Sequence, residues 1–217
     1  RSEYDVFADA VIGEEQFTTL ENDKVEIRFT NKGGRVYSAR LKDYKTHDSL
    51  PLILFEGDEA LLDFTLVTAT NRVVNTAGMY FQAIPGNDPN TLTMRLSAGD
   101  GRHLDFTYTL SKDDYMVKMD IKGTGLNGVL SPSTNALDLN WEQKIRQQEK
   151  GRKFEDQYAA IYYKFVADDV EYLSETKNDS KQLSNRLKWI AYKDKFFSTV
   201  LISEDGFEAT NLASNLI

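Results

Sequence analysis

Histidine is the side chain that most often serves as a general base or metal ligand near neutral pH, and this chain contains two, His47 and His103. If both met a carboxylate in one cleft, they could catalyse acid–base steps at the anomeric carbon of a sugar. His47 lies in a polar stretch between Lys45 and Asp48, and His103 follows a glycine-containing turn at the start of an expected strand. Because neither neighbourhood has features that would tune an imidazole for catalysis, we interpret both histidines as solvated loop residues.

Paired carboxylates are the second candidate for acid–base chemistry, and they occur at residues 113–114, 155–156 and 168–169. Neighbouring carboxylates on a strand point to opposite faces, and in a turn both face water. A glycosidase instead needs two carboxylates that converge across a cleft at ~5 to 10 Å. We therefore interpret these pairs as turn residues and predict no catalytic residue in this chain.

Sequence signatures of metal and nucleotide sites are absent. The chain has no cysteine, which excludes disulfides, thiolate zinc sites and a cysteine nucleophile. No calcium-loop, zinc-protease, phosphate-loop or serine-hydrolase signature occurs. Residues 123–128 are glycine-rich, but no βαβ pattern follows them, so we interpret them as a strand connection. We predict neither a cofactor nor a bound metal.

Two clusters could instead contact a protein. Residues 150–153 form the tightest basic cluster, but acidic neighbours on both sides favour a solvated loop of mixed charge. The densest aromatic group could form a platform for a partner, although aromatic residues at strand spacing more often fill the core of a β-sandwich. We favour the core interpretation for this group, which contains Trp189, Tyr192, Phe196 and Phe197. The sequence assigns no partner-binding residue.

The composition limits the partners of the chain. With 217 residues, of which 41% are hydrophobic, it can build the core of a β-sandwich. Its formal net charge of -8 opposes nucleic-acid binding and docking on an anionic lipid surface through a basic patch. No apolar run approaches the ~20 residues of a membrane-spanning helix, and the N-terminal residues lack the pattern of a signal peptide. We therefore expect a processed soluble domain, with any membrane segments outside this sequence.

Alternating residues predict the elements that would position any site. Residues 25–30 alternate between apolar and polar, an Asn-Lys-Gly-Gly turn interrupts them at 31–34, and residues 35–41 resume the pattern. Such a hairpin buries one face and exposes the other. The expected buried face contains Val25, Ile27 and Phe29 on one strand and Tyr37, Ala39 and Leu41 on the other.

Further strands are expected along the rest of the chain. Residues 92–121 predict a three-strand meander, and other strands are expected at 50–55, 62–67, 79–84, 137–141, 161–165, 170–173, 187–192 and 196–202. Loops are expected at 85–90 and 175–180, and the polar stretch 142–157 is either a solvated hairpin or a short helix. The predicted fold is all-β, a large antiparallel β-sandwich with few short helices. It has a lead-in at 1–16, the sandwich at 17–210 and the start of a helix or linker at 211–217.

Three segments resemble the large periplasmic domain of the YidC family of bacterial membrane-protein insertases. Residues 19–36 are similar to the family's opening strands, in which a strand begins after an Asn-x-Gly-Gly turn. Residues 50–55 resemble the short apolar strand that follows. Residues 189–202 resemble the closing segment, in which a tryptophan, a polar link and paired aromatic residues precede a β-strand.

The resemblance implies a twisted supersandwich like that of galactose mutarotase and related carbohydrate-binding domains. It also implies a periplasmic domain of an inner-membrane protein, so that residues 1–16 follow a preceding membrane helix and residues 211–217 lead toward the next. The family's insertion chemistry resides in later helices that this chain does not contain. The resemblance thus implies a non-catalytic interaction or scaffold domain, which contacts translocon accessory subunits or emerging membrane-protein chains.

Two alternatives stay open at this stage. A carbohydrate-binding or mutarotase-like domain would share the fold, which does not by itself fix the function, but it would have to recruit both His47 and His103. A ligand carrier would hold an apolar molecule between its sheets and would copurify with it. The sequence favours the interaction domain because that function needs no catalytic residue, cofactor or metal.

Overall fold

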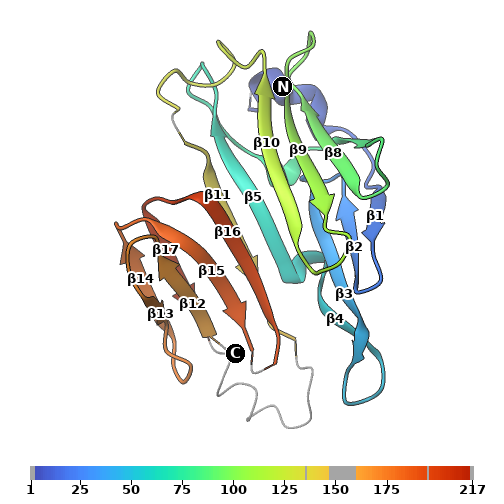
Figure 1. Cartoon of the computed structure of the whole chain (residues 1–217). Helices are drawn as coiled ribbons and strands as arrows, with labels where there is room; N and C mark the ends of the chain where they lie inside the picture. Colours follow the sequence, from blue (N-terminus) through green and yellow to red (C-terminus); the bar gives the residue numbers. More distant parts are fainter. Residues whose placement is uncertain (1–2, 135, 147–159, 195, 216–217) are drawn as a thin grey trace. The chain divides into compact units, whose positions relative to one another are not determined.

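The computed structural model of the chain describes residues 3–134, 136–146, 160–194 and 196–215. Strands dominate these residues, whose helices are three short 3-10 segments (Figure 1). None of the helices in this part of the chain is long and apolar enough to cross a membrane. The chain divides into an N-terminal unit, residues 1–45 and 50–144, and a C-terminal unit, residues 46–49 and 145–217. The prediction of an all-β fold built from antiparallel sheets is confirmed.

The N-terminal unit contains three antiparallel sheets. The first has the order β1-β2-β3-β4, with β1 (Phe17–Glu21), β2 (Val25–Thr30), β3 (Arg35–Lys45) and β4 (Pro51–Glu56). The second has the order β10-β9-β8-β7, with β7 (Gln82–Pro85), β8 (Thr91–Ser97), β9 (His103–Leu110) and β10 (Val117–Thr124). The third has the order β11-β5-β6, with β5 (Ala60–Val67), β6 (Val73–Asn75) and β11 (Asp138–Gln143). The short helices η1 (Asp5–Val11), η2 (Gly57–Glu59) and η3 (Thr76–Gly78) also belong to this unit.

Aromatic side chains join the three sheets of the N-terminal unit into one core. Phe29 of β2 packs against Tyr108 of β9, with ring centroids 4.7 Å apart. Phe106 lies on the same face of β9 and contacts Phe64 of β5 at 5.2 Å and Phe81 at 5.1 Å. All five side chains are buried. Because burying a large apolar side chain stabilises a protein by about 1.5–3 kcal/mol, this cluster is a principal source of the unit's cohesion.

The C-terminal unit has two sheets of its own. The larger has the order β13-β12-β15-β16, with β12 (Ala160–Phe165), β13 (Val170–Tyr172), β15 (Leu187–Lys193) and β16 (Ser198–Phe207). The smaller pairs β14 (Asp179–Leu183) with β17 (Thr210–Ser214). Tyr163 of β12 is fully buried; its hydroxyl donates to Glu171 at 3.0 Å and accepts from Lys181 at 3.2 Å. This hydrogen-bonded network links three strands and both sheets.

The strand pattern of the central part was predicted closely. The meander expected at residues 92–121 is formed by β8, β9 and β10, whose buried side chains alternate along β8 and β9. Strands β2, β4, β5, β11, β12, β13 and β15 also lie where they were expected, within one to three residues. Most of the polar stretch 142–157 lies outside the described residues, so its structure stays a prediction.

Five predictions about single segments need correction. Tyr37 does not share a face with Ala39, because a bulge in β3 turns its ring toward Phe17 (centroids 4.7 Å apart) and Arg28. Residues 210–214 form strand β17, where the start of a helix or linker was expected at 211–217, and β14 begins within the loop expected at 175–180. The strand expected at 79–84 is shorter and begins at Gln82. The lead-in contains η1, whose Phe7 is fully buried.

The predicted sandwich at 17–210 spans both compact units. Whether the two units behave as one domain stays a prediction.

Candidate functional site

The two histidines lie in different units and each pairs with an aspartate close to it in sequence. Nε2 of His47 is 2.8 Å from Oδ1 of Asp48, and Nε2 of His103 is 3.6 Å from Oδ2 of Asp105. His103 is the first residue of β9, and its side chain is only 17% exposed. The interpretation of His103 as a solvated loop residue was therefore wrong. Because each unit contains one histidine, neither unit by itself assembles the two-histidine site of a mutarotase.

Asp105 is the centre of a charge cluster in the N-terminal unit. The guanidinium of Arg95, on the adjacent strand β8, donates two hydrogen bonds to it, at 2.9 and 3.0 Å. These bonds raise the pKa of Arg95 above its ordinary value. Such fork-to-fork pairs hold both side chains in fixed geometry. Both carboxylate oxygens of Asp105 therefore bond to Arg95, and His103 lies beside them. The cluster resembles a cross-strand pair that stabilises the sheet.

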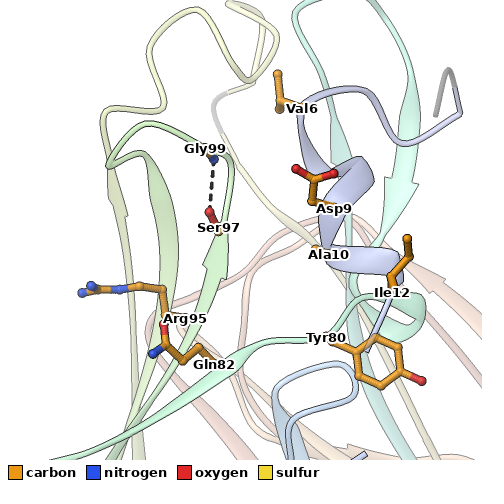
Figure 2. Close-up of a pocket in the computed structure, with 9 residues that line it drawn as sticks. All are labelled: Val6, Asp9, Ala10, Ile12, Tyr80, Gln82, Arg95, Ser97 and Gly99. Carbon is orange, nitrogen blue, oxygen red and sulfur yellow. Dashed lines mark hydrogen bonds between the residues drawn. The ribbon is translucent and has the colours of Figure 1, made fainter. Parts of the chain in front are cut away.

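A shallow hollow in the N-terminal unit lies next to this cluster. Its volume is about 210 Å³, below the roughly 300 Å³ at which ligand pockets typically begin. Figure 2 shows η1 on one side, with Ile12 and Asp9, and the ends of β7 and β8 on the other. The guanidinium of Arg95 points away from η1, and the hydroxyl of Ser97 accepts a hydrogen bond from the amide of Gly99 at 3.1 Å. The hollow therefore offers little to orient a small molecule.

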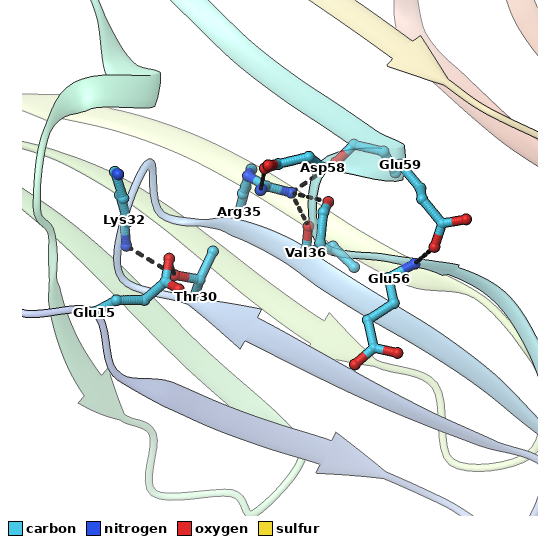
Figure 3. A network of polar contacts seen from close by, with 10 residues as sticks. Glu15, Thr30, Lys32, Arg35, Val36, Glu56, Asp58 and Glu59 are labelled. Atoms are coloured by element: carbon cyan, nitrogen blue, oxygen red, sulfur yellow. Dashed lines mark hydrogen bonds and ion pairs between the residues drawn. The ribbon is translucent and has the colours of Figure 1, made fainter.

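Arg35 is a buried charge, and it holds a turn (Figure 3). Its Nη1 donates to the carbonyls of Val36 at 3.2 Å, Gly57 at 3.2 Å and Ala60 at 2.7 Å. Nη2 lies 3.7 Å from the exposed carboxylate of Asp58. A cation that donates to one carbonyl of β3 and to two at the β4–β5 connection has an architectural role, because those donors are not available to a ligand.

The polar groups of the Asn-Lys-Gly-Gly turn between β2 and β3 also bond to other parts of the unit. The side chain of Asn31 donates to the carbonyl of Glu14 at 2.9 Å and accepts from the amide of Gln16 at 2.6 Å. Gly33 donates to the carbonyl of Met79 at 2.8 Å, and the carbonyl of Gly34 accepts from the hydroxyl of Tyr108 at 2.6 Å. The turn that marks the sequence most clearly is a junction between the lead-in, the first sheet and β9.

The aromatic group near the C-terminus does not form a single core cluster. Trp189 lies opposite Ile202 in the register of β15 and β16. Tyr192 is an odd number of positions further along β15, so its side chain lies on the opposite face of the strand. Trp189 is half-buried and Phe196 is 52% exposed. The prediction that this group fills the core was wrong for both residues. The core of this sheet is instead formed by Leu187, Ile190 and Tyr163.

The remaining candidates match turns or cannot be placed. Residues 113–114 and 168–169 lie in turns. The glycine-rich segment 123–128 begins with the last two residues of β10 and continues past the strand, with Gly125 at φ 63°. The basic cluster 150–153 and the acidic pair 155–156 lie outside the described residues. Within the ranges that the structure describes, no group of three or more histidine, aspartate or glutamate side chains could hold a metal ion.

Comparison with known proteins gives one consistent family. The family model described as the YidC periplasmic domain matches residues 18–216. A membrane protein insertase YidC from Parabacteroides distasonis is 66% identical over 99% of this chain. Relatives with the same name from Bacteroides fragilis and Porphyromonas gingivalis are 44% and 39% identical over 97% and 98% of the chain. The chain spans 34% of the length of each of these three relatives.

Proposed function

The chain belongs to the family of YidC periplasmic domains, and from this membership we propose that it is the non-catalytic interaction domain of a membrane-protein insertase. In this role it contacts accessory subunits of the translocon, or emerging membrane-protein chains, on the periplasmic side of the inner membrane. The observation that carries the proposal is the match of the family model to residues 18–216, nearly the whole chain.

The polar groups of the two units support a scaffold rather than an enzyme. The hydrogen-bonded side chains of Arg35, Asn31 and Asp105 bind other parts of the N-terminal unit itself. In the C-terminal unit, Tyr163 is held between Glu171 and Lys181. An acid–base catalyst needs side chains directed toward a substrate, whereas these are directed toward the backbone and toward one another.

The sheets also offer a way to bind other proteins. A strand at the edge of a sheet presents unpaired backbone groups that an extended chain can bond. Main-chain hydrogen bonds of this kind give affinity for many sequences, as a domain that meets different membrane proteins requires. The net charge of -8 favours segments that carry basic residues.

Photocrosslinking in the full-length insertase tests this proposal. A photoreactive amino acid is placed at Ile12, which is 82% exposed, at Tyr172, which is 55% exposed, and at the fully buried Phe7 as a control. We expect protein adducts from one or both exposed positions during membrane-protein synthesis and none from Phe7. The proposal is overturned if no exposed position yields a protein adduct while the chain accelerates the mutarotation of a hexose and His103→Ala abolishes that acceleration.

A further inference from the structure

Among the strands that the structure describes, β16 is a long edge strand with little protection against pairing. It lies at the end of the order β13-β12-β15-β16 and has ten residues. Proteins usually protect such edges by shortness, charges, prolines or bulges. The five residues from Ser198 to Ile202 contain none of these, and they pair with β15 without a register shift. The bulge in this strand pair lies beyond Ile202.

The other long edge strands in the described part of the chain are protected. β10 carries Lys118, Asp120 and Lys122 at alternate positions, and β11 carries Asp138 and Glu142. β4 begins with a proline, and its pairing with β3 is interrupted by two register shifts. β16 is therefore the long edge whose first half remains suited to accept another strand.

The backbone of β16 presents its unpaired groups at identifiable residues. The amide of Asp194 donates to the carbonyl of Phe197 at 2.9 Å, which fixes the first hydrogen-bonded pair of the β15–β16 hairpin. Bonding alternates along an antiparallel ladder, so Leu201 bonds to β15 while Val200 and Ile202 direct their N–H and C=O groups outward. These two outward residues are the positions to which a further strand would bond.

The side chains next to this edge are apolar and exposed. Val200 is 44% exposed and Ile202 is 47% exposed. They lie opposite Ala191 and Trp189 in the register, so they share a face with the half-buried indole. A strand added to β16 would cover this face with the alternate side chains of its own. The apolar positions of the added strand would thus meet Val200, Ile202 and their neighbours.

Two carboxylates at the far end of β16 define the charge of the partner. Glu204 and Asp205 are exposed, and among the described residues neither carboxylate has an ion pair or hydrogen bond. The contacts of Lys188 and Arg186 here go to the backbone carbonyls of these two residues, at 3.3 and 3.2 Å. In an antiparallel addition, the beginning of the incoming strand lies beside Glu204 and Asp205.

We propose that β16 binds an extended chain segment in which one or two basic residues precede alternating apolar residues. The segment adds antiparallel to the free edge, its cations lie beside Glu204 and Asp205, and its apolar side chains cover Val200 and Ile202. This assignment rests on the proposed function, because it names the surface on which an emerging chain would bind. A second copy of this chain fits less well, since pairing two β16 strands about Leu201 places Glu204 opposite Ser198 and leaves it without a cation.

Fluorescence anisotropy with the complete chain tests the assignment. The probe is a labelled ten-residue peptide that begins with two arginines and continues with alternating valine and threonine; a second peptide has two glutamates in place of the arginines. We expect the arginine peptide to bind more tightly, and the difference to shrink as salt rises. Replacing both carboxylates by Glu204→Gln and Asp205→Asn should weaken binding of the arginine peptide by up to about fivefold, as exposed ion pairs do.

Two edge variants and one matched control locate the binding strand. Val200→Lys places a charge on the apolar face, and Val200→Pro removes one outward N–H, at an edge position that tolerates proline. Each variant should weaken peptide binding at least about tenfold, because roughly one hydrogen bond or its apolar contact is lost. Ile121→Lys, at a 41% exposed position of β10, should leave binding unchanged. Circular dichroism confirms that each variant is folded.

Three outcomes overturn the assignment. The first is equal binding of the arginine peptide by the wild-type chain and a folded Val200→Lys variant. The second is equal binding of both peptides. The third is concentration-dependent self-association that Val200→Lys abolishes, which would identify a second copy as the occupant. If crosslinks to emerging chains persist in the full-length insertase while any of these outcomes holds, only the assignment to β16 fails and the proposed function stands.

Discussion

Asn22 uses its whole side-chain amide to join two turns of the N-terminal unit. Nδ2 donates to the carbonyls of Ser111 at 2.8 Å and Asp114 at 2.9 Å, and Oδ1 accepts from the amides of Lys24 at 2.8 Å and Val25 at 2.9 Å. The two donated bonds join the β1–β2 turn to the β9–β10 turn, and the two accepted bonds close the β1–β2 turn itself. A single polar residue therefore sets the position of one sheet relative to another within this unit.

Asn22→Ala should lower the free energy of unfolding by about 1–3 kcal/mol, because four backbone groups lose their partner. Asn22→Asp keeps the acceptor but sets a carboxylate against two carbonyl oxygens, so it should be at least as destabilising near neutral pH. Urea denaturation measures both variants. Asn87→Ala, in an exposed loop, is the matched control and should change the midpoint little. An Asn22→Ala variant as stable as Asn87→Ala would show that these bonds contribute nothing.

Tyr108 should ionise only when the protein unfolds. Its hydroxyl donates to the carbonyl of Gly34 in the core, and burial raises the pKa of this tyrosine well above 10. A group whose pKa is higher in the folded state stabilises that state below the unfolded pKa, and the contribution is lost as pH rises through the folded pKa. The chain contains 11 tyrosines. Burial also raises the pKa of Tyr163, and it raises the pKa of Tyr162 to about 12. Tyrosinate absorbance should therefore show a late phase shared by a few tyrosines, and the part that belongs to Tyr108 should coincide with loss of the β-sheet signal.

Tyr108→Phe should lower the amplitude of the late phase by one tyrosine and cost about 1–2 kcal/mol, because the carbonyl of Gly34 loses its donor. An unchanged amplitude of the late phase in the variant would show that Tyr108 does not contribute to it.

At the scale of elements, the β2–β3 turn depends on a glycine for two separate reasons. Gly34 has φ 60°, and a Cβ added there would lie 2.6 Å from the ring of Phe81. Gly101, in the β8–β9 turn, has φ 73° but nothing within 4 Å of such a Cβ. Both sites strain an L-residue through the backbone, and only Gly34 adds a steric clash.

Gly34→Ala should therefore be clearly more destabilising than Gly101→Ala, by about 1–3 kcal/mol, the usual cost of overpacking a core. Thermal or urea unfolding of the two variants gives the difference directly. Equal losses would mean that Phe81 moves aside without cost and that backbone strain alone selects glycine in this turn.

The strands that could be predicted are those in which apolar and polar residues alternate because one face of the strand is buried. Along β8 and β9 every second side chain is buried, so the period of two was visible in the sequence. Tyr37 was misplaced because a bulge shifts the register between Arg28 and Phe29, and composition does not reveal a bulge. Strand β17 was taken for a helix or linker because polar residues surround Leu212, its single buried residue.

The site residues were harder to predict than the strands. Trp189 was assigned to the core because buried aromatic residues are common in sandwiches, yet the same alternation that buries Ile190 leaves Trp189 on the opposite face. A stricter use of the period of two would have separated them. The edge position of β16 depends on which strands pair, which follows from contacts between distant residues and not from local sequence.

At the scale of the whole molecule, each compact unit has its own buried cluster. Phe29, Phe106 and Tyr108 lie in the N-terminal unit, and Tyr163 and Leu187 in the C-terminal unit. The most exposed apolar residues include Ile12 in the first unit and Phe196 in the second. Scattered apolar residues of this kind are normal on a soluble surface and do not by themselves bind lipid.

The net charge of -8 decides how the chain should behave at a lipid surface. An acidic protein is repelled by anionic headgroups, and this repulsion extends over about 8 Å at physiological ionic strength. We expect the chain to remain unbound in flotation assays with vesicles that contain anionic phospholipid, and to remain unbound with zwitterionic vesicles as well. Binding to the anionic vesicles alone would reveal a basic surface that the net charge conceals. Binding to both would point to insertion of exposed apolar residues, and either result would contradict the view that this domain contacts proteins rather than the bilayer.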